Sequence, residues 1–411
     1  MKIVAIKARE IFDSRGIPTV SCSIVLDDGT YVDAAVPSGA SVGSNEALEL
    51  RDGGPRLGGK GVQKAIENIH SKIAPVFMGR VIDAVAFDQE LLALDPSTQK
   101  LALGANAMLA VSMAFFKAHA SALGIELYSF IGQSLTLEEV TMPVPLINVI
   151  NGARHAHNNL TLQEYLLIPY GTLSFTQSME CAVEITYALK SLLKKNGKSV
   201  QTGDEGGFAP SFTSDVEPFD YIMQAIELAG YSSSDVALGI DAAATGWYNS
   251  QTQEYMLGTE KFKAPQLIEF YASLVQNYPI IYLEDGLHEE DWDNWQLLKN
   301  KLGESVRIVG DDLLVTQIDR ISRAIECKAV NGAIIKLNQV GTVSETLQAV
   351  LLCQEAGLVT IASHRSGETC DTFVADFALG VNANYLKCGG CMHGERVAKY
   401  NRLIEIESLK Y

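Results

Sequence analysis

The chain has 411 residues, of which 47% are hydrophobic and 20% are charged, so it holds ample apolar material for packed cores and is unlike a disordered chain. Its 49 acidic residues outnumber its 32 Lys and Arg and give a formal net charge of -17. This charge argues against nucleic acid or an acidic membrane surface as a partner. A small anionic substrate stays open, because a metal ion and a few cations can reverse the potential inside one cleft.

The chain begins with a strand-like pattern. Residues 3–12, 19–26 and 31–36 are short apolar runs, and the sequence Asp27-Asp28-Gly29 before the third run is typical of a hairpin turn. We expect a three-stranded meander here.

Residues 61–123 change to a helical pattern. Val62, Ile66, Ile69 and Ile73 are spaced for one buried helix face. The most apolar stretch, residues 101–116, is shorter than the roughly 20 residues that span a membrane, so we expect a buried helix and no membrane span. With the meander, these helices predict an α+β domain over residues 1–131, and a polar stretch at 132–139 marks its end.

The N-terminal residues carry charges and no long apolar segment, so we expect no export signal. The seven cysteines are scattered and odd in number, which favours reduced thiols in a cytoplasm. The pair Cys388 and Cys391, with His393 nearby, could indicate zinc binding or redox chemistry, but no second cysteine pair completes a structural zinc site. We favour free thiols in a tight glycine turn.

Residues 140–411 repeat a pattern of a short apolar run, a polar or charged residue, a loop and an amphipathic helix. The runs are 237–241, 280–284, 307–311, 333–336, 358–364 and 385–387. Their last residues follow one another at intervals of 23 to 43 residues, close to the length of a βα unit. This rhythm predicts an α/β barrel, in which the strand ends meet at one mouth and carry the chemistry.

Three of these runs end in acids, namely Asp241, Glu284 and Asp311. Such acids would repel one another unless a cation joined them, and carboxylate oxygens favour a hard ion such as magnesium. The alternative is that each acid caps the helix that follows it. Lys336 and Lys387 end two other runs, and we expect them to lower each other's pKa until one is neutral and can act as a base.

Three loops carry further candidate residues. The glycine-rich segment 203–210 holds Glu205 and lacks a nucleotide-binding motif, so we expect a mobile loop that presents an acid, with Glu164 in support. The segment 363–369 offers a phosphate cradle, the alternative being a Ser-His hydrolase, although no G-x-S-x-G elbow is present. His155 and His157 could suggest zinc, but a substrate loop fits better because no third ligand lies nearby.

With these residues placed, the chain closely resembles the enolase family over nearly its whole length. The resemblance rests on several segments in the family's order: Asp13-Ser14-Arg15-Gly16, Pro37-Ser38-Gly39-Ala40-Ser41, the 203–210 loop, Gly310-Asp311-Asp312, Ile335-Lys336-Leu337-Asn338-Gln339 and 363–369. It implies a small α+β domain followed by an eight-stranded TIM-like α/β barrel, over 140–411, whose first strands depart from simple alternation. It also implies a homodimer or larger homo-oligomer.

The reaction implied by the resemblance is the glycolytic one, the reversible dehydration of 2-phospho-D-glycerate, a small phosphorylated carboxylate, to phosphoenolpyruvate. Two Mg²⁺ ions are implied, the first held by Asp241, Glu284 and Asp311 and the second by Ser41. The use of a Lys or His base with magnesium is a known pattern of the superfamily.

The resemblance also implies roles for individual residues. Lys336 would remove the α-proton, and Glu205, supported by Glu164, would protonate the departing hydroxyl. Lys387 would stabilise the enolate and His155 would close over the substrate. The substrate-binding residues would include those of the phosphate segment: Ser363, His364, Arg365 and Ser366. The chain departs from the family pattern at Val42, Arg154 and Cys388, none of which removes a proposed catalytic group.

Two other functions stay open. An acid-sugar dehydratase could use a related barrel, but the cationic segment around Arg365 argues for a phosphorylated substrate. A catalytically weak relative could instead serve as a binding or scaffold protein at a surface or in a complex, for which the sequence shows no dedicated motif.

Overall fold

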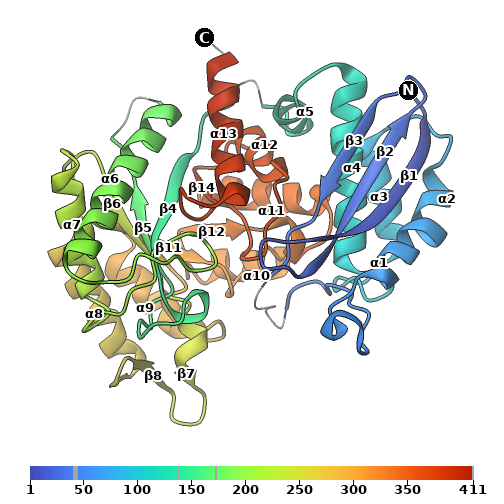
Figure 1. The fold of residues 1–411 in the computed structure, drawn as a ribbon. Coiled ribbons are helices and arrows are strands. Elements are labelled where there is room, and N and C mark those ends of the chain that lie inside the picture. Colours follow the sequence, from blue (N-terminus) through green and yellow to red (C-terminus); the bar gives the residue numbers. More distant parts are fainter. Residues whose placement is uncertain (40–44, 138, 172–173, 410–411) are drawn as a thin grey trace.

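The computed structural model describes residues 1–39, 45–137, 139–171 and 174–409. Its N-terminal strands are β1 (Ile3–Phe12), β2 (Pro18–Leu26) and β3 (Tyr31–Ala35), which pair antiparallel in that order. The predicted meander is confirmed. In Figure 1 this blue sheet lies at one side of the molecule, against the helix α4.

The helices of this part are α1 (Gln63–Asn68), a π-helical turn (Ile69–Ile73), α2 (Ala74–Phe77), α3 (Ala84–Leu94), α4 (Ala105–Leu123) and α5 (Leu127–Ser134), and a short 3₁₀ turn, Arg56–Gly59, precedes them. The predicted apolar face is buried, but the π-turn interrupts the regular helix that carries it. All residues of α4 from Ala105 to Phe116 are buried, as expected for the greater part of residues 101–116.

Among the helices in the described part of the chain, none is long and apolar enough by itself to cross a membrane. The pair α4 and α5 meets those criteria only together and is bent by 101°.

The remainder of the chain forms a closed eight-stranded barrel, as predicted. Its strands, in chain order, are β4 (Val144–Asn151), β5 (Glu164–Ile168), β6 (Ala237–Asp241), β10 (Ile280–Glu284), β11 (Arg307–Gly310), β12 (Gly332–Ile335), β13 (Val359–Ser363) and β14 (Tyr385–Lys387). Seven strands run parallel, whereas β5 is antiparallel to both β4 and β6. The departure from simple alternation implied by the resemblance is therefore present.

Helices surround this barrel (Figure 1): α6 (Phe175–Lys195), α7 (Glu217–Leu228), α8 (Ala264–Asn277), α9 (Trp292–Leu302), α10 (Ile318–Glu326), α11 (Val343–Glu355), α12 (Phe373–Gly380) and α13 (Gly394–Leu409). A small hairpin sheet, β7 (Tyr248–Asn249), β8 (Glu254–Leu257) and β9 (Glu260–Phe262), follows β6 and was not predicted. The short 3₁₀ turns Ala153–His155, Ala244–Trp247 and Leu337–Gln339 follow β4, β6 and β12.

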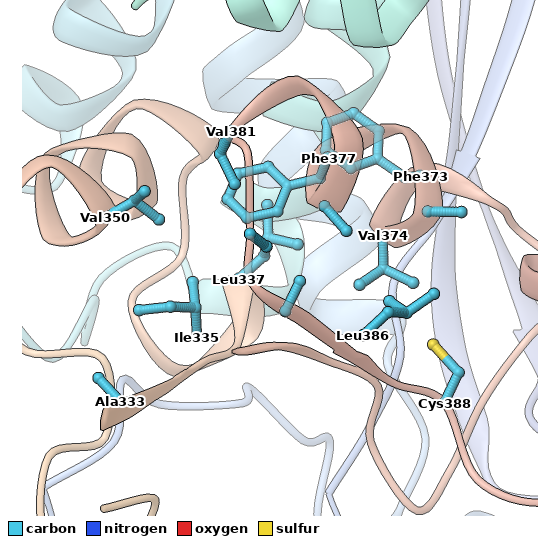
Figure 2. Close-up of a cluster of buried hydrophobic side chains, with 14 of the residues drawn as sticks. Ala333, Ile335, Leu337, Val350, Phe373, Val374, Phe377, Val381, Leu386 and Cys388 are labelled. Carbon is cyan, nitrogen blue, oxygen red and sulfur yellow. The ribbon is translucent and has the colours of Figure 1, made fainter. Parts of the chain in front are cut away.

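Alternating strand residues supply two apolar layers. One set, which includes Leu146, Tyr282 and Ile334, forms a separate buried cluster of strand residues. The other set packs outward against the helices. Figure 2 shows Ile335 and Leu386 facing Phe373 and Phe377 of α12. This packing on both sides holds the strand ends in fixed positions, which a site built from several strands requires.

Candidate active site

The carboxyl ends of the parallel strands surround a cavity of about 440 Å³. The cavity is lined by predicted residues from strand ends and from loops: His155, Glu164, Glu205, Asp241, Asp311, Lys336, Ser363, His364, Arg365, Ser366 and Lys387. Glu284 lies directly beneath them, at the end of β10, and is fully buried. Ser41 and Val42 lie outside the described residues.

Glu164 reaches this mouth for a different reason from the other acids. It is the first residue of β5, and because β5 runs antiparallel its start lies beside the end of β6, where Glu164 pairs with Asp241. The exceptional strand direction therefore adds a carboxylate that a parallel strand would have placed at the opposite end of the barrel.

Lys387 joins the carboxylates at the centre of the site. Its Nζ donates to Asp241 Oδ2 at 2.8 Å and to both oxygens of Glu284 at 2.8 Å, and it lies 3.2 Å from Glu164 Oε1. All four side chains are at least nine-tenths buried. Oxygens from β5, β6 and β10 thus converge on one cation.

Asp311 and Lys336, which follow β11 and β12, form a second ion pair and hydrogen bond. Gln339 Nε2 also donates to Asp311 Oδ1 at 3.1 Å. Burial is the largest influence on the pKa of Lys336 and lowers it, but the surrounding carboxylates, Asp311 first and then Glu284, together raise it above its usual value. The pKa of Lys387 is also raised, because its carboxylate partners outweigh burial. The expectation that one lysine is neutral is wrong for the chain without a metal, since each ammonium has carboxylate partners.

The cavity has an excess of negative charge. Eight described lining residues are acids and four are Lys or Arg. Burial and the charge of Asp241 together raise the pKa of Glu284 to about 8 in spite of Lys387. Asp285, Asp311 and Asp312 form a further group whose ligand oxygens lie within 4.8 Å of one another. These hard oxygen donors and their unbalanced charge fit a divalent cation such as Mg²⁺.

A second cluster joins two imidazoles to two carboxylates. His155 Nδ1 lies 3.4 Å from Glu205 Oε2 and 4.0 Å from Glu164 Oε1, and His364 Nε2 lies 3.5 Å from Glu205 Oε2. Burial and the charge of Glu205 raise the pKa of Glu164. Burial alone would raise the pKa of Glu205, but the two imidazoles hold it well below its usual value. Three buried atoms here, His155 Nδ1, Glu164 Oε2 and Glu205 Oε2, make no hydrogen bond.

The loop that carries Glu205 is packed against its neighbours in this structure, and its predicted mobility stays a prediction. Phe208 N donates to Val149 O at 2.8 Å, Gly207 N donates to Asn151 Oδ1 at 3.0 Å, and Gly390 N donates to Glu205 O at 2.7 Å. Backbone bonds to β4 and to the segment after β14 therefore fix the position of this acid.

Arg365 carries the cation expected of a phosphate site. Its guanidinium donates to both oxygens of Glu46, at 2.8 and 3.3 Å, and to Asn338 Oδ1 at 2.9 Å. The fork therefore already holds one planar anion, the Glu46 carboxylate, in the bidentate manner typical of arginine. Ser363 Oγ donates to the carbonyl of His364 at 3.0 Å and not to an imidazole, so this geometry does not support a Ser-His hydrolase.

The N-terminal part buttresses this loop. Ser38 and Gly367 exchange two backbone bonds of 2.7 and 2.9 Å, and Ser38 Oγ donates to Asp13 Oδ2 at 2.6 Å. A Cβ on Gly367 would lie 2.1 Å from that same Asp13 oxygen, so a side chain here would have to displace the Asp13 carboxylate. The segment 13–16, far away in sequence, therefore shapes the phosphate loop.

Family models give the decisive comparison. Residues 3–131 match the model described as enolase, N-terminal domain, and residues 139–409 match enolase, C-terminal TIM barrel domain. The chain belongs to the enolase family. Its match to both models agrees with the two-part fold, and the lyase-type chemistry of the enolase superfamily agrees with the acids and lysines at the barrel mouth.

Several residues of this enolase-family site were not predicted. Glu46 and Asn338 hold Arg365, and Asp285 accepts from the backbone N–H groups of Asp311 and Asp312 at 2.9 Å each. Arg396 on α13 reaches the site through buried bonds. The sequence signal for Asp285 is its place directly after a strand-end acid, whereas nothing local marks Arg396.

In the described residues, neither the cysteine pair nor the pair of His155 and His157 is assembled as a zinc site, and His155 clusters instead with Glu164 and Glu205. In the part of the chain that the structure describes, neither group of clustered ligand residues contains a cysteine or His157, and His157 is exposed. Burial raises the pKa of Cys388 and raises that of Cys391 to about 12, so both are unreactive thiols. All seven cysteines are free, as expected.

Proposed function

We propose that this protein catalyses the magnesium-dependent, reversible dehydration of 2-phospho-D-glycerate to phosphoenolpyruvate, the enolase reaction of glycolysis and gluconeogenesis. The observation that carries the proposal is that a lysine and a glutamate stand on opposite sides of a group of carboxylates that could bind a cation. Lys336 follows β12 and Glu164 begins β5, which lie four strands apart in a ring of eight and so face each other across the cavity.

Two Mg²⁺ ions, held by Asp241, Glu284 and Asp311 and, for the second ion, by Ser41, would supply positive charge that stabilises the developing enolate. The rest of the chemistry belongs to side chains of the chain. Neutral Lys336 would take the proton from C2, the C3 hydroxyl would leave as water with a proton from Glu205, and the C2–C3 double bond would form. That proton leaves in the water, so Glu205, whose pKa is low, would receive each proton it delivers from Glu164, whose pKa is raised, and the proton taken up by Lys336 would pass to solvent, from which Glu164 is protonated again.

Other groups would bind and orient the substrate. Arg365 and Ser366 would hold the phosphate, with Ser363 and His364 shaping the loop, while Lys387 would lie against the substrate's anionic oxygens and His155 would cover it. Protonation from one side and deprotonation from the other favour an anti elimination, because the two groups stand on opposite walls.

Lys336 must lose its proton before it can act. Burial, Arg365 and Lys387 lower its pKa, and Asp311 raises it. A cation bound to Asp311 would weaken the pairing that raises the pKa, which would bring Lys336 closer to a working base.

The test follows phosphoenolpyruvate formation by ultraviolet absorbance while magnesium is titrated. Lys336→Ala should lose the activity, whereas Lys261→Ala, an exposed lysine on β9, should retain it. No activity in the intact, folded protein at saturating magnesium would overturn the proposal.

We also propose a homodimer as the working unit and the cytoplasm as its location, which rest on the family resemblance and on the free cysteines. Sedimentation of the purified protein and fractionation of cells that produce it would test these two statements.

A further inference from the structure

Arg396, in the first turn of α13, is fully buried although its side chain carries a permanent charge. Nη1 donates to the carbonyl of Arg365 at 2.6 Å, and Nη2 donates to the carbonyls of Ser366 at 2.6 Å and of Asp204 at 3.2 Å. One guanidinium thus ties α13 to the phosphate loop and to the loop that presents the acid.

The fourth contact of Arg396 is with an imidazole. Nη1 lies 2.6 Å from His364 Nδ1, within hydrogen-bond distance. A guanidinium has only donors and keeps its proton in proteins, so Nδ1 must be the acceptor. The proton of neutral His364 then sits on Nε2, the nitrogen that faces Glu205 Oε2 at 3.5 Å. A doubly protonated ring would set two donors and two positive charges against each other.

The surroundings hold the ring in this orientation. Gly389 has φ +81°, and a Cβ there would lie 3.1 Å from His364 Cε1 and 3.0 Å from Arg396 Cδ. The ring is therefore packed closely beside Gly389. Glu395 Oε1, 3.4 Å from Arg396 Nε, adds a carboxylate on the far side of the guanidinium.

We propose that Arg396 is a positioning residue that fixes His364 as the neutral tautomer with its proton on Nε2, so that His364 presents a hydrogen-bond donor to Glu205. Its catalytic consequence rests on the proposed function, in which Glu205 delivers a proton to the leaving hydroxyl. Glu205 Oε2 makes no hydrogen bond in this structure, and the Nε2 proton of His364, 3.5 Å away, is the donor that would orient it. With the opposite tautomer, Nε2 would be an acceptor and would compete for the proton that Glu205 delivers. The pKa of His364, lowered to about 4 chiefly by burial, agrees with a neutral ring.

The first test reads the tautomer directly, by ¹⁵N NMR of histidine in the full-length protein without substrate or added metal. The signal of His364 is assigned by its absence in His364→Gln. At neutral pH the wild type should show His364 with its proton on Nε2 alone. Arg396→Met should give a mixture of tautomers or a proton on Nδ1. Lys100→Met is the matched control, because Lys100 is also buried and paired, with Glu345 Oε1 at 2.7 Å, but neither residue lines the cavity.

A wild-type ring with its proton on Nδ1 or on both nitrogens would overturn the proposal, and so would an unchanged tautomer in Arg396→Met. Arg396→Lys provides a second variant that retains the buried charge if the Met variant does not fold. It should keep the Nε2 proton, because an ammonium also has only donors.

The second test is kinetic. Arg396→Lys, which keeps the Nε2 proton, should stay close to the wild type, whereas Arg396→Met should lower kcat about 10- to 100-fold, the range typical of groups that orient a reacting residue, with little change in KM. In a His364→Gln background the same substitution should cost far less, since Arg396 acts through His364. Equal losses in both backgrounds would contradict the proposal. An inactive wild type would refute the proposed function, while the NMR result would still decide the tautomer.

Discussion

Lys387→Met removes the ammonium that joins three buried carboxylates. Lys387 Nζ lies 2.8 to 3.2 Å from oxygens of Asp241, Glu284 and Glu164, and methionine has a similar length but no charge. Breaking a buried pair by removing one partner costs about 3–5 kcal/mol. For a domain of this size, each kcal/mol lowers Tm by about 2–4 °C, so we expect a decrease of roughly 6–20 °C without added metal.

This loss should depend on pH. The pKa of Glu284 is raised to about 8, so the stability that its protonated form contributes is fully present below its usual pKa and is lost as pH rises through about 8. Since Lys387 lowers that pKa, its removal leaves more uncompensated charge at high pH. We expect the destabilisation at about pH 5.5 to be smaller than at about pH 8.5 by at least about 1.4 kcal/mol, the value of one pKa unit.

Urea unfolding and thermal melts of the chelator-treated protein at both pH values measure the change in the free energy of unfolding. Lys261→Met is the control, because Lys261 is exposed and its loss should change stability by less than about 0.5 kcal/mol. Added Mg²⁺ should recover much of the loss, because it supplies positive charge to the same carboxylates. A Lys387→Met protein as stable as the wild type at about pH 8.5, or a loss independent of pH, would refute the reasoning.

Two further substitutions test how the site is shaped. Gly389→Ala should destabilise the protein by more than about 3 kcal/mol and abolish activity, because φ is +81° and the new Cβ would lie 2.5 Å from the backbone oxygen of Glu205. Gly29→Ala is the control, because Gly29 has a similar φ of +89° but open space around it. It should cost only about 1–2 kcal/mol and leave activity intact. Comparable losses in melts and turnover for both would contradict this. Arg365→Lys should raise KM for the phosphorylated substrate about tenfold or more, because the bidentate fork is lost. An unchanged KM in steady-state assays would show that Arg365 does not bind the substrate's phosphate.

The sequence by itself determined the elements whose signals are local. The meander followed from alternating apolar residues and a turn, α4 from an apolar stretch too short for a membrane, and the barrel from repeated strand-loop-helix units. It also located Asp241, Glu284 and Asp311, because residues that end successive parallel strands must meet at one mouth.

Only the tertiary structure decided features that depend on contacts between distant segments. Glu164 reaches the site because β5 is antiparallel, so its first residue and not its last lies at the mouth. The lysines are charged without a metal because each finds carboxylates from other strands. Arg396 reaches His364 from the last helix, 32 residues away. Hydrogen-bond partners and pKa values depend on distances in space, which local patterns in a sequence do not contain.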